Sequence, residues 1–398
     1  MSPIRFLIVT LLALVTWTSK PAVACQAVPT AAPEEAGLSS DGLEKIPTRM
    51  KEFVDAQQAA GVVSLIAAKG KVVHLSAVGQ ADLDEKRAMT TDSVFAIASM
   101  TKPMTAASVM ILQDEGKLKL DDPVSKYIPA FADIKLKSGA APSRPVTVRD
   151  CLRHTNGLVS DQRNTGTLQE TAEALAHSPL AFEPGSKWQY SPGLSVAGRV
   201  VEVVSGKPFD VFLSERIFKP LGMNETTFHP TAEQLKRLAK LYQPDKDGKG
   251  LQPGSHWLFE VSDATTPNPS GGLYSTATDL VQFYQMVLND GELNGHRILS
   301  ASAVKEMTTL QTEKLETGFT SGNGWGLGFC LVQEPQGPTA ALSKGSFGHG
   351  GAFGTQGWID PSRKMIFVLL IARTNFGNGD ASELRSELQR LAVEAATK

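Results

Sequence analysis

Two serines in this 398-residue chain are each followed three positions later by a lysine, in the segments Ser99-Met100-Thr101-Lys102 and Ser302-Ala303-Val304-Lys305. Residues at positions i and i+3 of a helix share a face, so the lysine amine lies close to the serine hydroxyl. A neutral amine placed there can take the hydroxyl proton and make the serine a nucleophile. The pattern is short and occurs twice, so its surroundings have to identify a reactive copy.

The second copy opens an amphipathic stretch. Val304, Met307 and Leu310 recur at helical spacing, which indicates a helix with one buried face. Serine is a preferred N-cap residue because its oxygen accepts a hydrogen bond from a free N–H of the first turn. We therefore expect Ser302 to cap this helix and to have a structural role.

The first copy follows the apolar run Val94-Phe95-Ala96-Ile97-Ala98 and precedes a helix that we expect from Met104 to Gln113, ending at Gly116. Pro103 fits the first turn of such a helix, where its missing N–H has no helical partner to lose. Free backbone N–H groups at a helix N-terminus carry positive partial charge. The start of this helix is therefore suited to stabilising an oxyanion.

The apolar surroundings also bear on the charge of Lys102. Desolvation disfavours a charged amine, so a buried lysine can be neutral and act as the base toward Ser99. A capping serine followed by a solvated lysine explains the same local sequence. The local pattern leaves both interpretations open.

Further segments decide between these interpretations. After Phe95 to Lys102 they are, in order, Leu120-Asp121-Asp122-Pro123-Val124-Ser125-Lys126-Tyr127-Ile128-Pro129, Thr147-Val148-Arg149-Asp150-Cys151-Leu152-Arg153-His154-Thr155-Asn156-Gly157-Leu158, Pro184-Gly185 leading to Tyr190-Ser191-Pro192, Pro220-Leu221-Gly222-Met223, Ser270-Gly271-Gly272-Leu273, Gly324-Trp325-Gly326-Leu327-Gly328 and Gly348-His349-Gly350-Gly351. Together these segments resemble the β-lactamase superfamily of serine hydrolases, which includes class C β-lactamases, family VIII carboxylesterases and DD-peptidases of the penicillin-binding-protein group. The resemblance extends over about Val62 to Arg373.

The resemblance implies a catalytic role for three residues. Ser99 takes the role of the acylated nucleophile and Lys102 that of its lysine partner, while Tyr190 matches the first residue of the family's Tyr-x-Asn element. A tyrosine hydroxyl held near a lysine can pass protons between the serine, the leaving group and water. The alternative for Tyr190 is an aromatic residue of a surface loop after Pro184-Gly185.

The resemblance also implies a substrate-binding strand. His349, Gly350 and Gly351 stand where the family has Lys-Thr-Gly or a variant, and small residues there let a substrate approach the backbone. The backbone N–H groups of Ser99 and Ala352 are the implied oxyanion hole. His349 either offers the substrate a cation or a hydrogen bond, or is a structural histidine at the strand end.

The implied reaction is hydrolysis of a small ester, amide or β-lactam through an acyl-serine intermediate, without a metal or other cofactor. Pro192 stands where the family has an asparagine, whose amide can bind the acylamino group of a β-lactam or peptide. Proline lacks that donor and acceptor, so we expect a preference for simple esters. Alternatives are a β-lactamase, a D-alanyl-D-alanine carboxypeptidase or D-aminopeptidase and, from another class, a penicillin-binding sensor without turnover. The chain contains no Gly-x-Ser-x-Gly, so the α/β-hydrolase elbow is not the source of the serine.

Three polar residues in the matching segments are expected to be structural. The resemblance places His154 in a turn, where it would hydrogen-bond to backbone. Asp121 and Asp122 are adjacent, and adjacent residues do not share a helix face. We therefore expect capping or turn roles for these two carboxylates rather than a paired acid and base.

The remaining pattern predicts the elements that position these residues. A helix is expected over Ser39 to Gln58, with Pro47 kinking or delaying it, followed by a hairpin of Gly61 to Ala68 and Val72 to Val78. Helical periodicity dominates the middle. The C-terminal part returns to strands at Gly345 to Gly348, Gln356 to Ile359 and Met365 to Ile371, and closes with a helix over Ala381 to Ala396.

These elements predict an α/β fold of the α+β type, with one antiparallel sheet flanked by the N- and C-terminal helices and an inserted, mainly helical lobe. We expect a single domain over residues 36–398, with a sheet lobe over about 36–97 and 300–398 and a helical lobe over about 98–299. A site between the two lobes is the natural expectation.

The N-terminus has the order of a signal peptide. Arg5 precedes the apolar run Phe6 to Trp17, and Ala22-Val23-Ala24 has the small-x-small form of a cleavage site. We therefore expect a signal peptide over residues 1–24, a leader over 25–35 and an exported protein, either periplasmic or secreted. Cys25 directly follows the small residues, so lipid attachment there is the alternative to free release.

Charge and cysteine content exclude several other classes. The chain has 39 basic and 41 acidic residues with no long run of either sign, which gives no reason to expect a nucleic-acid partner. Cys151 and Cys330 have apolar neighbours and form no metal-binding pair, so we expect buried free thiols. The seven histidines show no paired spacing, which argues against a metal site.

Overall fold

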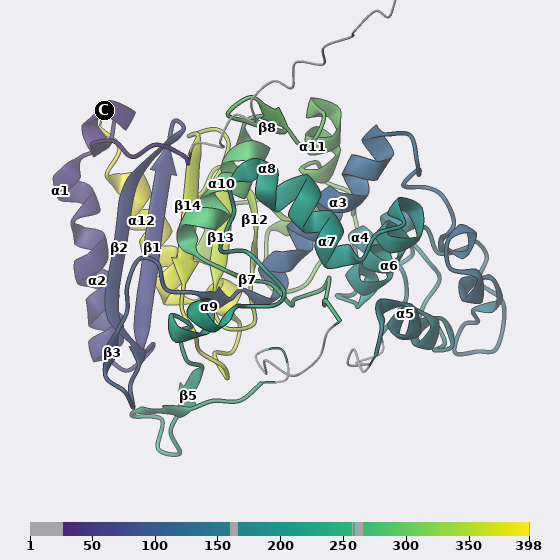
Figure 1. Cartoon of the computed structure of the whole chain (residues 1–398), viewed down its shortest axis with the longest axis horizontal. Coiled ribbons are helices and arrows are strands. Elements are labelled where there is room, and N and C mark those ends of the chain that lie inside the picture. The colour runs from purple at the N-terminus through teal and green to yellow at the C-terminus, as the bar shows by residue number, and fades with distance from the viewer. Residues whose placement is uncertain (1–26, 160–165, 257, 259–265, 398) are drawn as a thin grey trace, which may run out of the picture.

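The computed structural model describes residues 27–159, 166–256, 258 and 266–397. One antiparallel sheet has the strand order β10-β11-β12-β13-β14-β1-β2-β3, so the N-terminal strands lie directly beside the C-terminal ones (Figure 1). This confirms the sheet expected from the two ends of the chain. Its strands are β1 Gly61–Ala68, β2 Lys71–Asp82, β3 Arg87–Ala88, β10 Asn323–Trp325, β11 Cys330–Val332, β12 Phe347–Gly350, β13 Gln356–Asp360 and β14 Met365–Leu370. The expected signal peptide and Cys25 lie outside the described residues.

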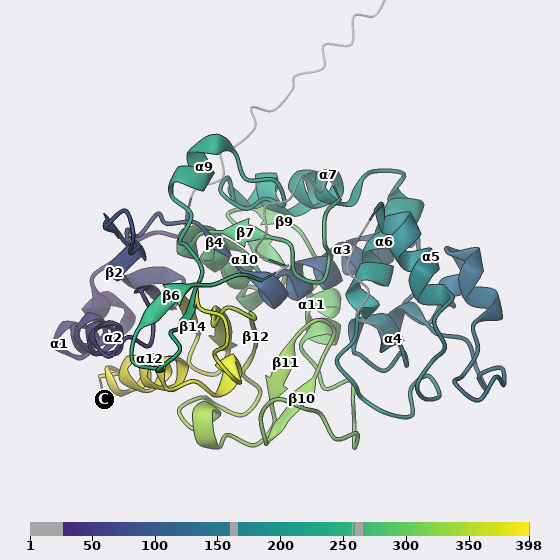
Figure 2. The same cartoon turned by 90° about the horizontal axis from the view of Figure 1, so that it is seen from below.

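Three helices cover one face of the sheet. They are α1 Ser40–Leu43, α2 Lys45–Asp55 and α12 Glu383–Glu394, and Figure 2 shows them together on one side of the strands. Ser39 caps α1 by accepting a hydrogen bond from the Gly42 N–H at 3.3 Å. The single helix expected here is divided at Glu44, which fits the missing N–H of Pro47 in the first turn of α2.

The opposite face of the sheet is covered by α10, Ala277–Leu288, which packs against β1, β13 and β14. We expected this stretch within the helical lobe, so the boundary between the lobes is different from the expected one. α10 is buried along almost its whole length because it lies between the sheet and the other helices. Its apolar residues join the larger hydrophobic core, while a second core lies between the sheet and α1, α2 and α12.

The helical lobe surrounds α3. Its helices are α3 Lys102–Asp114, α4 Val148–Leu152, α5 Leu168–Ala176, α6 Gly193–Ser205, α7 Phe209–Leu213, α8 Lys219–Leu221, α9 Ala232–Lys236 and α11 Ala301–Met307. The same part of the chain also contains short antiparallel strand pairs: β4 Phe95–Ala96 with β7 Tyr274–Ser275, β5 Tyr242–Pro244 with β6 Leu251–Pro253, and β8 Glu292–Leu293 with β9 His296–Arg297. α6, α7 and α11 contact α3, which is buried from Lys102 to Leu112. The first Ser-x-x-Lys segment therefore opens the most enclosed helix of the lobe.

The serine and the lysine of the second Ser-x-x-Lys segment lie on the surface. Ser302 and Lys305 are both exposed on α11. Ser300 is the N-cap of this helix and accepts from the Ala303 N–H at 3.0 Å, so the expectation that Ser302 is the cap was wrong by two residues. Both serines can cap a first turn, but it is Ser300 that has the extended backbone of an N-cap residue.

The described residues confirm one further expectation. Cys151 and Cys330 are buried free thiols. No group of histidine, cysteine and carboxylate side chains in the described ranges could hold a metal ion. Among the same residues, no helix is both long and apolar enough to cross a membrane.

Candidate active site

Ser99 lies in a short 3-10 helix, Ala98–Thr101, that runs directly into α3. The Lys102 Nζ donates to the Ser99 Oγ at 3.1 Å, so the contact expected from the i, i+3 spacing is present. Ala98, immediately before Ser99, has φ of 44°, a left-handed conformation that non-glycine residues seldom adopt. Thr101 holds this turn by donating to the Ala98 carbonyl at 2.7 Å and accepting from the Leu273 N–H at 3.2 Å.

Lys102 is buried without a carboxylate partner among the described residues. Besides Ser99, its Nζ donates to the Ser270 carbonyl at 2.6 Å. Burial lowers the pKa of Lys102 to about 7. A substantial share of the amine is therefore neutral near pH 7 and able to accept a proton from the Ser99 hydroxyl.

The carbonyl that receives Lys102 is fixed by contacts on both sides. Thr105 on α3 donates to the Pro269 carbonyl at 2.7 Å, and the Ser270 Oγ lies 2.9 Å from the Ser195 Oγ on α6. The Ser270 N–H donates to the Asn268 Oδ1 at 2.9 Å. Sequence reasoning singled out Ser270-Gly271-Gly272-Leu273 as a segment but missed the role of its carbonyl. The glycine pair was the available signal, because it marks backbone that packs closely.

Tyr190 lies between Lys102 and His154. The Lys102 Nζ is 4.6 Å from the centroid of the Tyr190 ring, and His154 stacks on the ring at 4.5 Å with an interplanar angle of 30°. Burial raises the pKa of Tyr190, and a side-chain hydrogen bond with Ser99 opposes that shift. The structure thus brings Ser99, Lys102 and Tyr190 together, with a neutral phenol beside the serine.

His154 occupies a turn and bonds to backbone, as expected. Its φ is 63°, and its Nδ1 accepts from the Ser191 N–H at 3.2 Å. Asn156 donates from Nδ2 to the Ser191 Oγ at 2.8 Å. The His-Thr-Asn-Gly segment therefore holds the chain on both sides of the Tyr190-Ser191 peptide and presents the ring.

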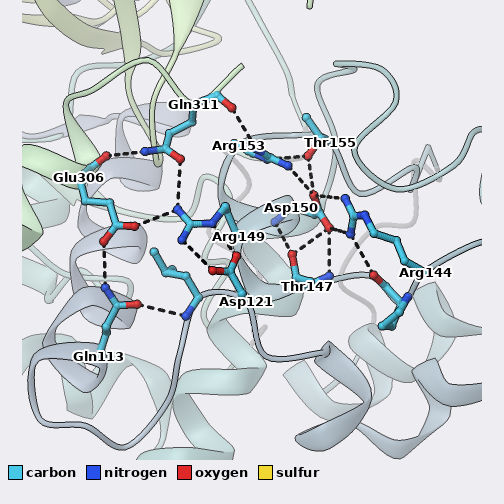
Figure 3. A network of polar contacts seen from close by, with 12 residues as sticks. Gln113, Asp121, Arg144, Thr147, Arg149, Asp150, Arg153, Thr155, Glu306 and Gln311 are labelled. Atoms are coloured by element: carbon cyan, nitrogen blue, oxygen red, sulfur yellow. Dashed lines mark hydrogen bonds and ion pairs between the residues drawn. The ribbon is translucent and has the colours of Figure 1, made fainter. Parts of the chain in front are cut away.

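A network of ion pairs and hydrogen bonds surrounds Asp150, which lies on α4 just before this segment (Figure 3). The buried Asp150 carboxylate receives Arg144 at 2.6 Å and Arg153 at 3.1 Å, and Thr155 also donates to it at 2.8 Å. Although burial raises the pKa of Asp150, its hydrogen bonds to Arg144 and Thr155 outweigh that effect and lower it. Asp150 is therefore a charged structural group that fixes the turn before His154.

Asp121 and Asp122 have separate structural partners. Asp121 pairs with Arg149 at 2.7 Å, and Arg149 also reaches Glu306 on α11 at 2.9 Å (Figure 3). Asp122 accepts from the Tyr127 hydroxyl at 2.5 Å and pairs with Lys126 at 2.9 Å. The two carboxylates share no partner, which confirms the structural roles expected for them.

β12 carries His349 into the aromatic surroundings of Tyr190. Its ring centroid lies 6.2 Å from that of Tyr190 and 5.6 Å from that of Trp325. Burial lowers the pKa of His349 to about 4, so the ring is neutral at pH 7, and its Nδ1 donates to the Gly350 carbonyl at 2.6 Å. Of the roles expected for His349, this environment favours a hydrogen bond and disfavours a cation. Its Nε2 is left as an acceptor without a partner in the described ranges.

The glycines after His349 permit close approach of the strand end to the Ser99 segment. A Cβ atom on Gly351 would lie 2.5 Å from the Ile97 carbonyl oxygen, and one on Gly350 would lie 1.9 Å from the Asp380 Oδ1. The contact with the Ile97 backbone requires glycine at 351, whereas at 350 the Asp380 side chain would have to move to admit a Cβ atom. Gly354 closes a turn by donating to the Gly351 carbonyl at 2.9 Å, and Ala352 lies inside that turn. β12 also contacts the 3-10 helix of Ser99.

A helix-covered antiparallel sheet with serine and lysine at the start of a buried helix is the fold of β-lactamases and penicillin-binding proteins. The solved structure of EstCE1, described as a hydrolase with promiscuous acyltransferase activity, matches with a TM-score of 0.76 and 26% identity, covering 90% of this chain and 99% of that one. A family model described as Beta-lactamase matches residues 46–392. The chain therefore belongs to the beta-lactamase family.

Two curated relatives cover most of the chain. A putative D-alanyl-D-alanine carboxypeptidase of Escherichia coli O157:H7 is 30% identical, covering 85% of this chain and 84% of its own length. Esterase EstB of Burkholderia gladioli is 28% identical, covering 78% of this chain and 85% of its own. These names differ in the kind of bond that is cleaved.

Proposed function

We propose that the protein is a serine hydrolase that cleaves a small carboxylic ester through an acyl-Ser99 intermediate. The observation that carries the proposal is the contact of Ser99 at 3.1 Å with a buried amine that lies 4.6 Å from the centroid of the Tyr190 ring. A surface serine beside a solvated lysine would have neither the desolvated amine nor the second proton carrier.

The geometry supports a sequence of proton transfers. Neutral Lys102 takes the proton of Ser99 as its oxygen attacks the ester carbonyl carbon. The N–H groups of Ser99 and Ala352 are proposed to hold the negative oxygen that forms. The bond to the alcohol oxygen then breaks, and that oxygen leaves with a proton delivered through Tyr190. Water attacks the acyl-serine next, releasing the acid and returning the proton to Ser99.

The ester preference rests on the N-cap position of α6. Pro192 occupies it, and a proline side chain offers neither donor nor acceptor to an acylamino group. Ser195, the nearest hydroxyl on the first turn of α6, is paired with Ser270 at 2.9 Å. A simple ester has no acylamino group and loses nothing at such a site.

The D-alanyl-D-alanine carboxypeptidase relative makes cell-wall peptide cleavage the second candidate. Parallel assays of p-nitrophenyl butyrate, nitrocefin and a D-alanyl-D-alanine peptide on wild type and Ser99→Ala separate the candidates. We expect the highest kcat/KM on the butyrate, and none in the Ser99→Ala variant. A markedly higher kcat/KM on nitrocefin or the peptide would contradict the ester preference.

We also propose that the enzyme acts outside the cytoplasm. The support is the order of basic, apolar and small residues at the N-terminus. Fractionation of cells expressing the full chain, with mass analysis of the mature N-terminus, tests this proposal and reveals whether Cys25 carries lipid. Cytoplasmic retention with an uncleaved N-terminus would contradict it.

A further inference from the structure

Phe319 combines exposure with backbone strain. Its side chain is 47% exposed, more than that of any other large hydrophobic residue in the described ranges. Its φ of 78° is left-handed, a conformation that is a true outlier for a bulky residue. Glycine or asparagine would ease the backbone there, and an exposed ring gains little from burial. Neither backbone preference nor core packing explains a phenylalanine at this position.

The ring lies next to the proposed proton carrier. Its centroid is 5.0 Å from that of Tyr190 with an interplanar angle of 77°. His154 covers one face of Tyr190, and the Lys102 amine lies over the ring as well. The T-shaped arrangement is a favourable aromatic contact. Phe319 thus adds an exposed apolar surface beside Tyr190.

Contacts around Phe319 hold it in place. Asn378 donates from its Nδ2 to the Phe319 carbonyl, and Asn378 is itself fixed as the cap of the 3-10 helix Gly379–Ala381. The Phe319 ring meets Trp188 at 6.0 Å with an interplanar angle of 89°. Gly318 packs so closely that a Cβ atom there would lie 3.0 Å from the Trp188 ring. A strained residue persists when its surroundings fix it in this way, and such residues gather at functional sites.

We propose that Phe319, backed by Trp188, binds the alcohol group of the substrate and favours esters of aromatic alcohols. This inference rests on the proposed function, in which Tyr190 delivers a proton to the departing alcohol oxygen. The group attached to that oxygen must lie beside Tyr190, where the exposed ring is. An aromatic group there can pack against Phe319 edge to face or in an offset stack.

The test uses two isomeric esters that differ only in which side carries the phenyl ring. Benzyl acetate has an aromatic alcohol, and methyl phenylacetate has an aromatic acyl group. In Phe319→Asn, which tolerates the left-handed backbone, the ratio of kcat/KM for benzyl acetate to that for methyl phenylacetate should fall roughly tenfold. Phe319→Leu, which keeps apolar bulk, should show a smaller fall. Leu235→Ala, at another exposed apolar residue on α9, is the matched control and should leave the ratio unchanged.

Each outcome bears on the inference. A ratio unchanged in Phe319→Asn, or one that rises because the loss falls on methyl phenylacetate, would overturn it while leaving the proposed function intact. Wild type that hydrolyses neither these esters nor p-nitrophenyl butyrate would overturn the proposed function and the inference together. A melting temperature of Phe319→Asn equal to or above that of wild type is expected, and a large drop would assign Phe319 to packing instead.

Discussion

Lys102 and Asp150 are both buried ionisable groups, yet the surroundings of Asp150 stabilise its charged form and those of Lys102 favour its neutral form. Asp150 receives two arginines and two threonine hydroxyls, so it stays charged in the interior. Lys102 has one serine hydroxyl and one backbone carbonyl, and burial alone lowers its pKa to about 7. Ion pairs keep a buried group such as Asp150 charged and give it a structural role. A buried amine without an ion-pair partner, such as that of Lys102, can exchange protons at neutral pH.

The largest expected effect is the loss of activity when Lys102, the buried group without a charged partner, or its neighbour Ser99 is replaced. Ser99→Ala and Lys102→Ala should each lower kcat/KM for p-nitrophenyl butyrate by more than about 100-fold, with folding intact. The double variant should be little worse than either single variant, because both residues act on the same proton and acyl transfer. Either single variant retaining more than about a tenth of wild-type kcat/KM would break the proposed mechanism.

Tyr190→Phe removes only the hydroxyl and keeps the ring that packs against His154 and Phe319. We expect kcat/KM to fall by about 100-fold, since a positioned proton carrier typically contributes that much. The melting temperature should stay near that of wild type. Unchanged kcat/KM would show that another group delivers the proton.

Replacement of Asp150, the buried group with charged partners, should lower the free energy of unfolding. Asp150→Ala leaves Arg144 and Arg153 without their shared carboxylate, and breaking a buried pair costs about 3–5 kcal/mol of unfolding free energy. Asp121→Ala is the matched control, because this carboxylate is mostly exposed and its pair with Arg149 is worth at most about 1 kcal/mol. Denaturant unfolding measures both. Equal losses in the two variants would remove the contrast between buried and exposed pairs.

The pH dependence of kcat/KM and of the unfolding free energy should follow the protonation of Lys102. Below its pKa of about 7 the amine holds its proton and cannot act as the base, so kcat/KM should fall about tenfold per pH unit and level off above pH 7. The unfolded chain binds more protons than the folded one between about pH 7 and 10.5, so unfolding free energy should rise with pH there. Lys102→Met should lose that rise. A flat activity profile from pH 5 to pH 9 would contradict the assignment of Lys102.

Side-chain motifs were predictable from the sequence, and backbone contacts were not. The spacing of Ser99 and Lys102, joined to the resemblance at Tyr190, predicted three groups that do lie together. The role of the Ser270 carbonyl was missed because every residue carries a carbonyl, and the glycine pair that follows Ser270 marks close backbone packing but not a hydrogen-bond partner. Phe319 was missed for a related reason, since a positive φ in a loop has no sequence signature when the residue is not glycine.

The positions of helices and strands along the chain were predicted better than the packing of these elements against one another. The strand patterns at both ends of the chain predicted the sheet, because alternation and apolar runs are local signals. Helical periodicity was expected throughout the middle of the chain, which includes α10, but the sequence of a helix that is buried on most sides does not indicate which layer of the fold it joins. The position of α10 on the sheet is decided by long-range packing with β1, β13 and β14.

Covalent labelling tests the central claim most directly. Wild type incubated with a fluorophosphonate at pH 8 should gain the mass of one adduct, and peptide mapping should place it on Ser99. Ser99→Ala should remain unlabelled, and Ser302→Ala, at the exposed serine of the second Ser-x-x-Lys segment, should label like wild type. No adduct on wild type, or an adduct that persists in Ser99→Ala, would contradict the account.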